Sequence, residues 1–262
     1  MRISSLYRYP VKGLSPERLS SADLTAGHYF PGDRLFAIEN GPSGFDPANP
    51  VHQPKIKYLM LMRNERLAQL RTRYDDASGE LVIGLDGSEA LRASTATQDG
   101  LAAITAFFED FMPEELRGEP RFLTAPASYR FTDSRSGFVS IINLASVADL
   151  ASRIGAPVDP LRFRGNVMVE GLEPWAELEL AGRELTTASG IRLRGIKRIE
   201  RCAATNVDPE TAARDLQIPK ALMNHYGHVD CGLYCEILEG GRLSEGMQID
   251  IASAEQAALG IA

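Results

Sequence analysis

One stretch decides how this chain is read: Gly195-Ile196-Lys197-Arg198-Ile199-Glu200-Arg201-Cys202-Ala203-Ala204-Thr205-Asn206-Val207-Asp208-Pro209-Glu210-Thr211. Three cations lie within the five residues before Cys202. Nearby positive charge favours the thiolate, which is the form that binds metals and attacks electrophiles. Short polar side chains follow, so the stretch predicts a lining for an anionic ligand. It also fits a strand end with a buried free cysteine, and the residues leave both readings open.

Length and composition are those of a soluble globular protein of one or two domains. Of its 262 residues, 44% are hydrophobic and 24% are charged. A net charge of −7 argues against a general nucleic-acid binder but allows a local cationic pocket. Three cysteines form no disulfide framework and fit a reducing cytoplasm. Since we find no signal peptide and no apolar run of 18 residues, we expect a cytoplasmic protein without a membrane span.

The first hundred residues are predicted to be mainly strands. Residues 2–9, 18–27 and 35–38 have strand patterns, and each ends in a turn. The Gly, Pro, Asn and Asp residues of 40–54 predict a long loop, which is often a functional one. Residues 56–94 are predicted as strands with a hairpin turn at Asp86-Gly87, although 58–74 also fit a helix.

A helix and a domain boundary are expected next. Apolar residues spaced by three and four predict an amphipathic helix over residues 95–111. The pattern breaks near residues 113–121, so we predict a β-rich N-terminal domain over 1–116, a second domain over 117–254 and a tail over 255–262.

The second half reads as many short strands with few helices. Residues 138–143 form a strand, and the following helix ends near Gly155. The close strand spacing favours a barrel or sandwich over a parallel sheet. Residues 212–225 are helix-like, although Pro219 interrupts them. The predicted fold class is therefore mostly β with a few helices, α+β.

Six segments together resemble the MOSC domain proteins that carry an N-terminal MOSC β-barrel domain, such as the amidoxime-reducing components and their bacterial homologues. The segments are Tyr9-Pro10-Val11-Lys12-Gly13, Asp33-Arg34, residues 143–150, Phe163-Arg164-Gly165-Asn166, residues 201–209 and Gly232-Leu233-Tyr234. Their order matches that family along residues 1–252, and the segment around Cys202 is the specific one. The resemblance implies a MOSC-type β-barrel domain beside an N-terminal β-rich subdomain.

This resemblance implies a site for the molybdenum cofactor, a molybdopterin. The family cysteine that matches Cys202 is the protein ligand to molybdenum, and a soft thiolate suits that role. Basic and polar residues would hold the cofactor's phosphate and pterin: Lys12, Arg34, Asn143, Arg164, Asn166, Arg201, Thr205 and Tyr234. Asn206 and Asp208 would lie near the metal, where substrate approaches. The implied reaction is reductive oxygen removal from small N-hydroxylated substrates such as hydroxylamines and amidoximes.

Two features depart from the family pattern. Glu200 stands where relatives commonly have a small residue, and a carboxylate there would repel a phosphate unless it points away or pairs with an arginine. The chain also has no run of cysteines for an iron–sulfur cluster, which some bacterial relatives carry. We therefore expect electrons to come from a separate donor protein.

Two other roles are open for the cysteines. MOSC domains also occur in molybdenum cofactor sulfurases, so Cys202 could hold a persulfide in a sulfur or cofactor carrier. Two imidazoles and two thiols are available for zinc, from His225, His228, Cys231 and Cys235, although their spacing fits no common zinc finger. The two histidines also fit an ordinary loop, and strand alternation directs Cys235 toward the core.

Overall fold

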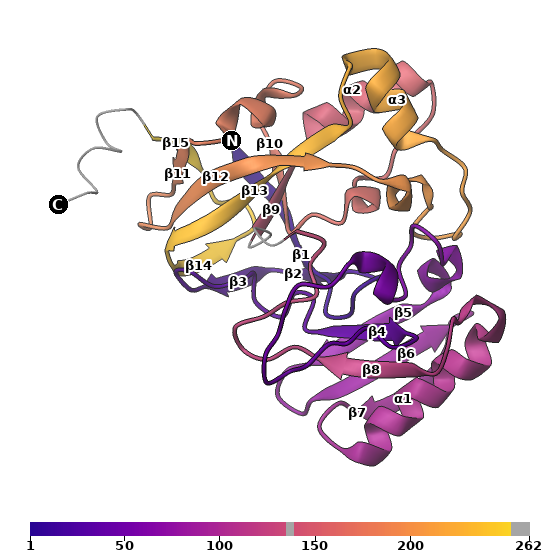
Figure 1. Ribbon diagram of the computed structural model, residues 1–262. Helices are drawn as coiled ribbons and strands as arrows, with labels where there is room; N and C mark the ends of the chain where they lie inside the picture. The colour runs from indigo at the N-terminus through magenta and orange to yellow at the C-terminus, as the bar shows by residue number, and fades with distance from the viewer. Residues whose placement is uncertain (135–138, 253–262) are drawn as a thin grey trace.

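The structure, a computed structural model, describes residues 1–134 and 139–252 and consists of two stacked units (Figure 1). The upper unit contains an eight-stranded sheet, whose order is β15 (Asp250–Ile251), β11 (Glu184–Thr186), β12 (Arg192–Glu200), β13 (Asp230–Glu239), β9 (Val139–Asn143), β10 (Val167–Glu170), β1 (Arg2–Arg8) and β2 (Glu17–Leu19). Strands from both ends of the chain therefore share one sheet. The predicted tail and Phe138 lie outside the described residues.

The N-terminal segment belongs to the upper unit. Ile3 of β1 lies opposite Val169 of β10, and β3 (Ser21–Leu24) pairs with β14 (Gly241–Ser244). The predicted strand over 18–27 is in fact two strands, β2 and β3, which pair with different partners.

One parallel pair lies within this mostly antiparallel sheet. Strands β9 and β10 run parallel, and α2 (Leu144–Ile154) lies between them in the chain. A parallel connection needs a crossover, which is usually a helix. The strand spacing favoured a barrel or sandwich over a parallel sheet, and this one β9–α2–β10 unit is the parallel exception among the described strand pairs.

The lower unit contains the rest of the N-terminal half. β4 (Phe36–Asn40) pairs with β8 (Pro120–Thr124), and β5 (Arg71–Asp75), β6 (Glu80–Leu85) and β7 (Ser88–Ser94) form a meander. The predicted turn at Asp86-Gly87 joins β6 to β7, with both residues at positive φ as a type I′ turn requires. The predicted amphipathic helix is α1 (Gln98–Phe111), which Thr97 caps.

The prediction of strands over residues 56–70 is wrong. This segment holds two 3₁₀ helices, η1 (Lys55–Lys57) and η2 (Glu65–Gln69), and only Tyr58 makes an isolated bridge to β4. The amide of Met60 bonds to the Asn64 side chain instead of to a neighbouring strand. Most apolar residues of this segment are buried although they form no strand, so hydrophobicity alone does not predict the secondary structure here.

The third α-helix begins later than the pattern suggested. Helix α3 (Ile218–Tyr226) carries Pro219 in its first turn, where a missing N–H costs no helical bond. Pro219 therefore starts this helix and does not interrupt it. Four shorter 3₁₀ helices complete the described elements: η3 (Pro113–Glu115), η4 (Pro160–Phe163), η5 (Ala176–Leu180) and η6 (Ala203–Asn206).

The two units have separate apolar cores, and the fold is α+β and mostly β, as predicted. The lower core also includes Val11, Val207 and Ala212, which come from segments that connect to upper strands. None of the helices in residues 1–134 and 139–252 has the length and apolarity needed to cross a bilayer. What matters for function is the space between the units.

Candidate functional site

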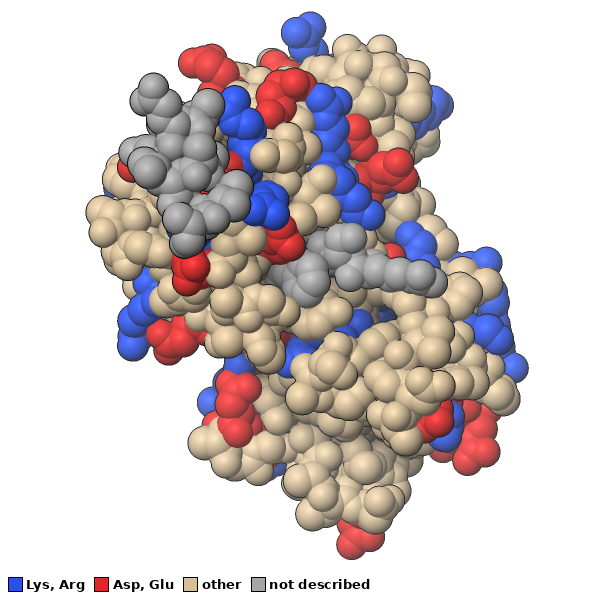
Figure 2. Space-filling view, turned by 60° about the vertical axis from the view of Figure 1, so that its left-hand side comes forward, with Lys and Arg blue, Asp and Glu red and all other residues tan. Residues whose placement is uncertain are grey.

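A pocket of ≈ 680 Å³ lies between the two units. Its described lining contains eight Lys and Arg side chains but three Asp and Glu: Lys12, Arg34, Lys55, Arg162, Arg164, Lys197, Arg198 and Arg201 against Asp33, Asp133 and Glu200. Figure 2 shows Lys and Arg atoms at the waist between the units. A chain of net charge −7 thus concentrates positive charge in one cavity, which suits an anionic ligand.

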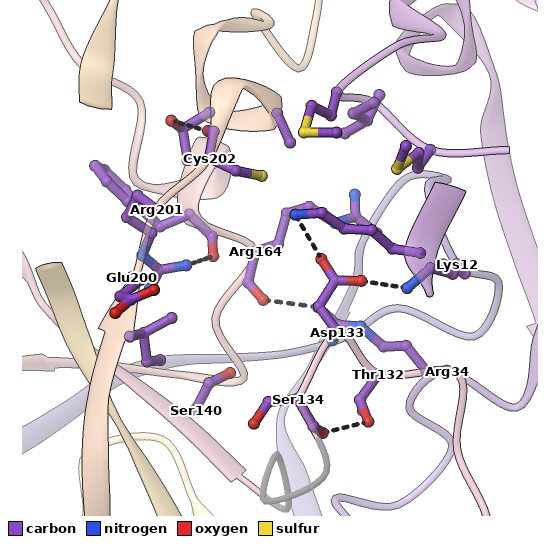
Figure 3. A pocket seen from close by; sticks show the side chains of 18 of the residues that line it. Lys12, Arg34, Thr132, Asp133, Ser134, Ser140, Arg164, Glu200, Arg201 and Cys202 are labelled. Atoms are coloured by element: carbon purple, nitrogen blue, oxygen red, sulfur yellow. Dashed lines mark hydrogen bonds and ion pairs between the residues drawn. The ribbon is translucent and has the colours of Figure 1, made fainter. Parts of the chain in front are cut away.

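Cys202 points its sulfur into this pocket from the upper unit (Figure 3). It follows β12 and precedes η6, and it is half-buried. Thr205 donates its hydroxyl to the Cys202 carbonyl at 2.9 Å, and its amide bonds to the same oxygen at 3.1 Å. These two bonds fix the backbone that carries the thiol.

Arg201 is held by backbone oxygens. Its Nε donates to the Cys231 carbonyl at 2.7 Å, and its Nη1 donates to the Phe163 carbonyl at 2.8 Å. The guanidinium carbon lies 5.3 Å from the centre of the Phe163 ring, within the range of a cation–π contact. Burial lowers the pKa of Arg201. Because neutral carbonyls hold the side chain, its charge is available to the pocket.

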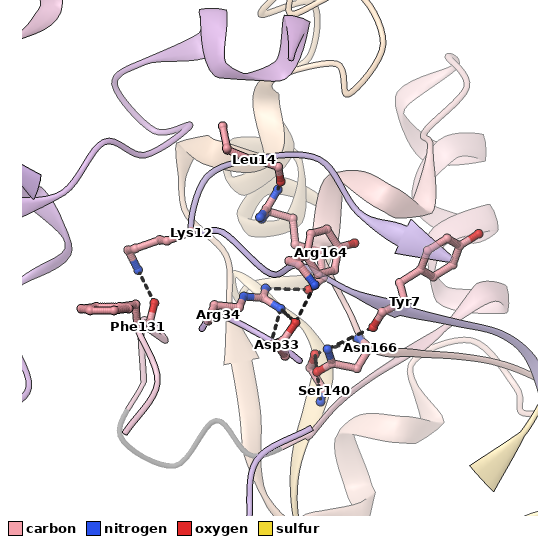
Figure 4. Close-up of polar contacts among 10 residues, drawn as sticks. Tyr7, Lys12, Leu14, Asp33, Arg34, Phe131, Ser140, Arg164 and Asn166 are labelled. Atoms are coloured by element: carbon pink, nitrogen blue, oxygen red, sulfur yellow. Dashed lines mark hydrogen bonds and ion pairs between the residues drawn. The ribbon is translucent and has the colours of Figure 1, made fainter. Parts of the chain in front are cut away.

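Arg34 and Arg164 lie close together on the far wall (Figure 4), and both contact the ring of the buried Tyr9. The Arg34 and Arg164 guanidinium carbons lie 4.5 and 4.3 Å from the centre of the Tyr9 ring. Both arginines have left-handed backbone, at φ 48° and 52°. Such strain in residues other than glycine is typical of functional sites. The shared ring fixes the spacing of the two cations.

One carboxylate serves this pair of cations. Arg34 Nη1 donates to both Asp33 oxygens at 2.6 Å, and the Tyr9 amide donates to Asp33 Oδ1 at 2.8 Å. Arg164 Nη1 donates to the Leu14 carbonyl at 2.7 Å. Among the described residues, the buried Nη2 of Arg164 has no partner. The wall therefore has one shielded donor left over, which fits an anionic ligand.

Lys12, Asp133 and Lys55 form a second charged group. Lys12 pairs with Asp133 and donates to the Phe131 carbonyl at 3.0 Å, and Lys55 lies 3.9 Å from Asp133. Burial lowers the pKa of Lys12, and Asp133 opposes this effect. Burial also disfavours the charge of Lys55, but Asp133 and Cys202 together raise its pKa. An ammonium therefore lies beside both the thiol and a carboxylate.

Eight of the residues predicted from the sequence line this pocket: Lys12, Arg34, Arg164, Asn166, Arg201, Cys202, Thr205 and Tyr234. Asn166 is occupied by structural bonds, since its Oδ1 accepts from the Ser140 hydroxyl at 2.8 Å and its amide donates to the Tyr7 carbonyl. Figure 4 shows this contact beside Arg34.

Three of the predicted site residues do not line the pocket: Asn143, Asn206 and Asp208. Asn143 is fully buried, caps α2 and donates to Glu177 at 3.0 Å. Asn206 Oδ1 accepts the Ile218 amide at 2.9 Å, at the start of α3. Asp208 pairs with Arg162 at 2.8 Å and accepts the Thr211 amide. All three stabilise local structure.

No sequence pattern points to Asp133, Lys55 or Tyr9 as individual site residues. Asp133 lies in a loop without a motif, and Lys55 only closes the long loop that was expected to be functional. Glu200 does line the pocket, on the Cys202 side and opposite Lys12 and Arg34 (Figure 3). Its carboxylate therefore lies across the pocket from Lys12 and Arg34.

The proposed zinc residues do not assemble. In residues 1–134 and 139–252, no group of three or more His, Cys, Asp and Glu side chains is placed to hold a metal ion. Cys231 and Cys235 are fully buried, and burial raises the pKa of each thiol. Of the three cysteines, Cys202 is the one that reaches the pocket.

Part of the chain is similar to a curated protein. The mitochondrial amidoxime-reducing component 1 of Homo sapiens is 29% identical over 90 residues, which are 34% of this chain and 26% of that protein. The match thus spans about a quarter of that relative's length.

Among solved structures, the YuaD protein from Bacillus subtilis is 14% identical with a TM-score of 0.45, covering 95% of this chain and 94% of its own. YiiM from Geobacillus stearothermophilus is 17% identical with a TM-score of 0.37, and the match covers 51% of this chain and 67% of YiiM.

The family models account for nearly the whole chain. The model of the MOSC N-terminal beta barrel domain matches residues 1–118, and the MOSC domain model matches residues 128–250. The chain therefore belongs to the MOSC domain proteins that carry an N-terminal MOSC β-barrel domain.

Proposed function

We propose that this protein binds a molybdenum cofactor in the pocket, with Cys202 as the metal ligand, and reduces N-hydroxylated compounds. The observation that carries this proposal is the pairing of one accessible thiol with a cavity lined by eight Lys and Arg side chains. The distant relationship to an amidoxime-reducing component supports the choice of reaction.

The residues present fit an anionic cofactor. The unpartnered Nη2 of Arg164 and the neighbouring Arg34 would hold its phosphate, since arginine suits phosphate geometry. Lys12 would add charge on the same side, and Arg201 would add it near the thiol. When bound, the cofactor would supply a two-electron redox centre for cleavage of an N–O bond.

The chain's own groups would orient the substrate and supply protons. Reduction of R₂N–OH to R₂NH and water consumes two electrons and two protons. Lys55 is placed beside Cys202 and Asp133, where its ammonium can donate a hydrogen bond to the substrate hydroxyl. Asp133 would hold Lys55 in that position. Electrons would come from a separate protein, in a reducing cytoplasm.

The test is elemental analysis of protein made in a host that synthesises the cofactor. We expect molybdenum close to one atom per chain in the wild type and a loss of about tenfold or more in Cys202→Ser. The control is Cys235→Ala, which alters a buried thiol outside the pocket and should keep its molybdenum. The loaded wild type should reduce an amidoxime with reduced viologen as the electron source.

Two results would contradict the proposal. Equal molybdenum in the wild type and Cys202→Ser would exclude Cys202 as the ligand. A mass increase of about 32 Da on Cys202 without molybdenum would favour a persulfide and thus the sulfur-carrier alternative.

A further inference from the structure

A second groove of ≈ 430 Å³ adjoins the pocket in the lower unit. Met62 lines both cavities, so the groove opens beside the mouth of the site. Ile56 also lines the groove and is 39% exposed, which is unusual for a large apolar side chain among the described residues. Together with the half-buried Met62, Ile56 gives the groove an apolar surface beside its charged side chains.

The groove also carries positive charge that the protein itself does not neutralise. The side chains of Arg63 and Arg117 are exposed and make no hydrogen bond or ion pair with another described residue. The acidic groups nearby are engaged, because Glu65 pairs with Arg214 at 2.9 Å and Glu115 accepts the Asn64 amide at 2.9 Å. Arg63 and Arg117 are therefore available to a partner.

We propose that this groove docks the electron-donor protein and that the donor is acidic at its contact surface. The inference rests on the proposed function, since a reductase must receive its electrons from a donor. An acidic donor would be repelled by a chain of net charge −7 unless a local patch attracts it. Arginine beside apolar residues is the composition of a protein contact, and the shared Met62 brings the donor next to the pocket.

The test uses loaded enzyme and a plant-type [2Fe–2S] ferredoxin as the acidic probe. The variant is Arg63→Glu with Arg117→Glu, and neither residue lines the site pocket. The matched control is Arg242→Glu with Arg183→Glu, which makes the same charge change on exposed arginines of the upper unit. We measure amidoxime reduction driven by ferredoxin and by reduced viologen, together with ferredoxin binding by fluorescence anisotropy.

We expect ferredoxin-driven kcat/KM to fall at least about tenfold in the groove variant and about twofold or less in the control. Viologen-driven turnover should be unchanged in both, and the ferredoxin difference should shrink at high salt. Equal losses in both variants would overturn the docking site, as would absence of ferredoxin binding to the wild type at low salt. A changed amidoxime KM with viologen would instead assign the groove to the substrate and overturn the proposal.

The two proposals fail in different ways. If the wild type has no viologen-driven activity, the proposed function fails. The anisotropy titration still decides the docking site in that case, because it needs no turnover.

Discussion

At the scale of single residues, Arg164 places a buried guanidinium charge in the pocket wall, and this charge lowers the stability of the folded state. Its guanidinium packs on Tyr9, beside Arg34, and Nη2 has no partner among the described residues. Burial and Arg34 lower the pKa of Arg164 to about 10. A shielded charge without a carboxylate of its own destabilises the fold. Sites that bind anions often carry this kind of stability cost.

We therefore predict that Arg164→Gln raises the melting temperature of the cofactor-free protein by roughly 2–4 °C while lowering bound molybdenum. Thermal unfolding followed by circular dichroism and metal analysis measure the two effects. The control is Arg192→Gln on β12, where the arginine pairs with Glu184 outside the pocket. A melting temperature below that of the wild type would refute the prediction.

Asp133 gives a prediction about pH. Burial opposes its charge, but Lys12, Lys55 and Arg34 lower the pKa of Asp133 to about 2. A depressed pKa stabilises the folded state above the unfolded value of roughly 4 and loses that contribution as pH falls through 2. The wild type should therefore exceed Asp133→Asn in stability at pH 5–7, and the gap should close between about pH 4 and pH 2.

Urea unfolding at several pH values measures this gap. Asp23→Asn is the control, because Asp23 is exposed and makes no ion pair with a described residue. A gap between the wild type and Asp133→Asn that stays constant down to pH 2 would show that the carboxylate charge does not stabilise the fold.

The sequence could identify the thiol and several of the cations, but not how side chains are used. Cys202 and Arg201 are neighbours in the sequence, so their closeness in space needs no tertiary information. Asn143 lies at a helix start, as the sequence indicates, but its side-chain amide donates to Glu177, which lies in a distant segment. Asp133 meets Lys12 across about 120 residues of chain, and no local pattern encodes that contact. Long-range pairing is what local pattern reading cannot supply.

At the scale of elements, Gly232 of β13 lets the Ile141 carbonyl and the Arg201 side chain approach the backbone of this strand closely. Gly232 has φ +90°, and an added Cβ would lie 2.6 Å from the Ile141 carbonyl oxygen and 3.1 Å from Arg201 Nη2. Gly227 after α3 has a similar φ of +75°, but an added Cβ would meet nothing within 4 Å. Substitution of Gly227 therefore tests backbone strain alone, whereas substitution of Gly232 tests backbone strain and steric crowding together.

We predict that Gly232→Ala destabilises the protein by about 2–4 kcal/mol and also lowers bound molybdenum, because it displaces Arg201. Gly227→Ala should cost about 1 kcal/mol and leave the metal content unchanged, since only the left-handed backbone is penalised. Urea unfolding and elemental analysis compare the two variants. Equal losses of stability would mean that crowding at Gly232 is relieved at no cost.

Elements with a clear spacing of apolar residues or a clear turn motif were predictable from the sequence. Segments whose backbone is fixed by side-chain hydrogen bonds were not. The spacing of apolar residues gave α1, and the Asp86-Gly87 turn gave the β6–β7 hairpin. The apolar run before η2 has no clear hydrophobic period. It forms no strand ladder at Met60, because the Met60 amide donates to the Asn64 side chain. A single side-chain bond thus overrides a hydrophobic pattern that suggests strands.

At the scale of the whole molecule, arginines of the upper unit bind the lower unit at two places. Arg8 of β1 pairs with Asp76 and donates to the Tyr74 carbonyl at 2.8 Å in the lower unit. Arg214 of the upper unit bonds to the Leu61 carbonyl and to Glu65, each at 2.9 Å. The pocket therefore exists only while the two units stay together, and its geometry depends on these ties.

Unfolding should accordingly be a single cooperative transition. Trp175, the one tryptophan, reports on the upper unit, and hydrogen exchange of α1 amides reports on the lower unit. We predict coincident urea midpoints for both probes, because Val207 of the upper chain segment is buried in the lower core. Replacing Arg8 and Arg214 together by alanine should separate the midpoints, with α1 opening first, whereas Arg18→Ala, an exposed arginine within the upper unit, should not. If α1 already opens at lower urea in the wild type, the units are independent and the ties hold the pocket without coupling the cores.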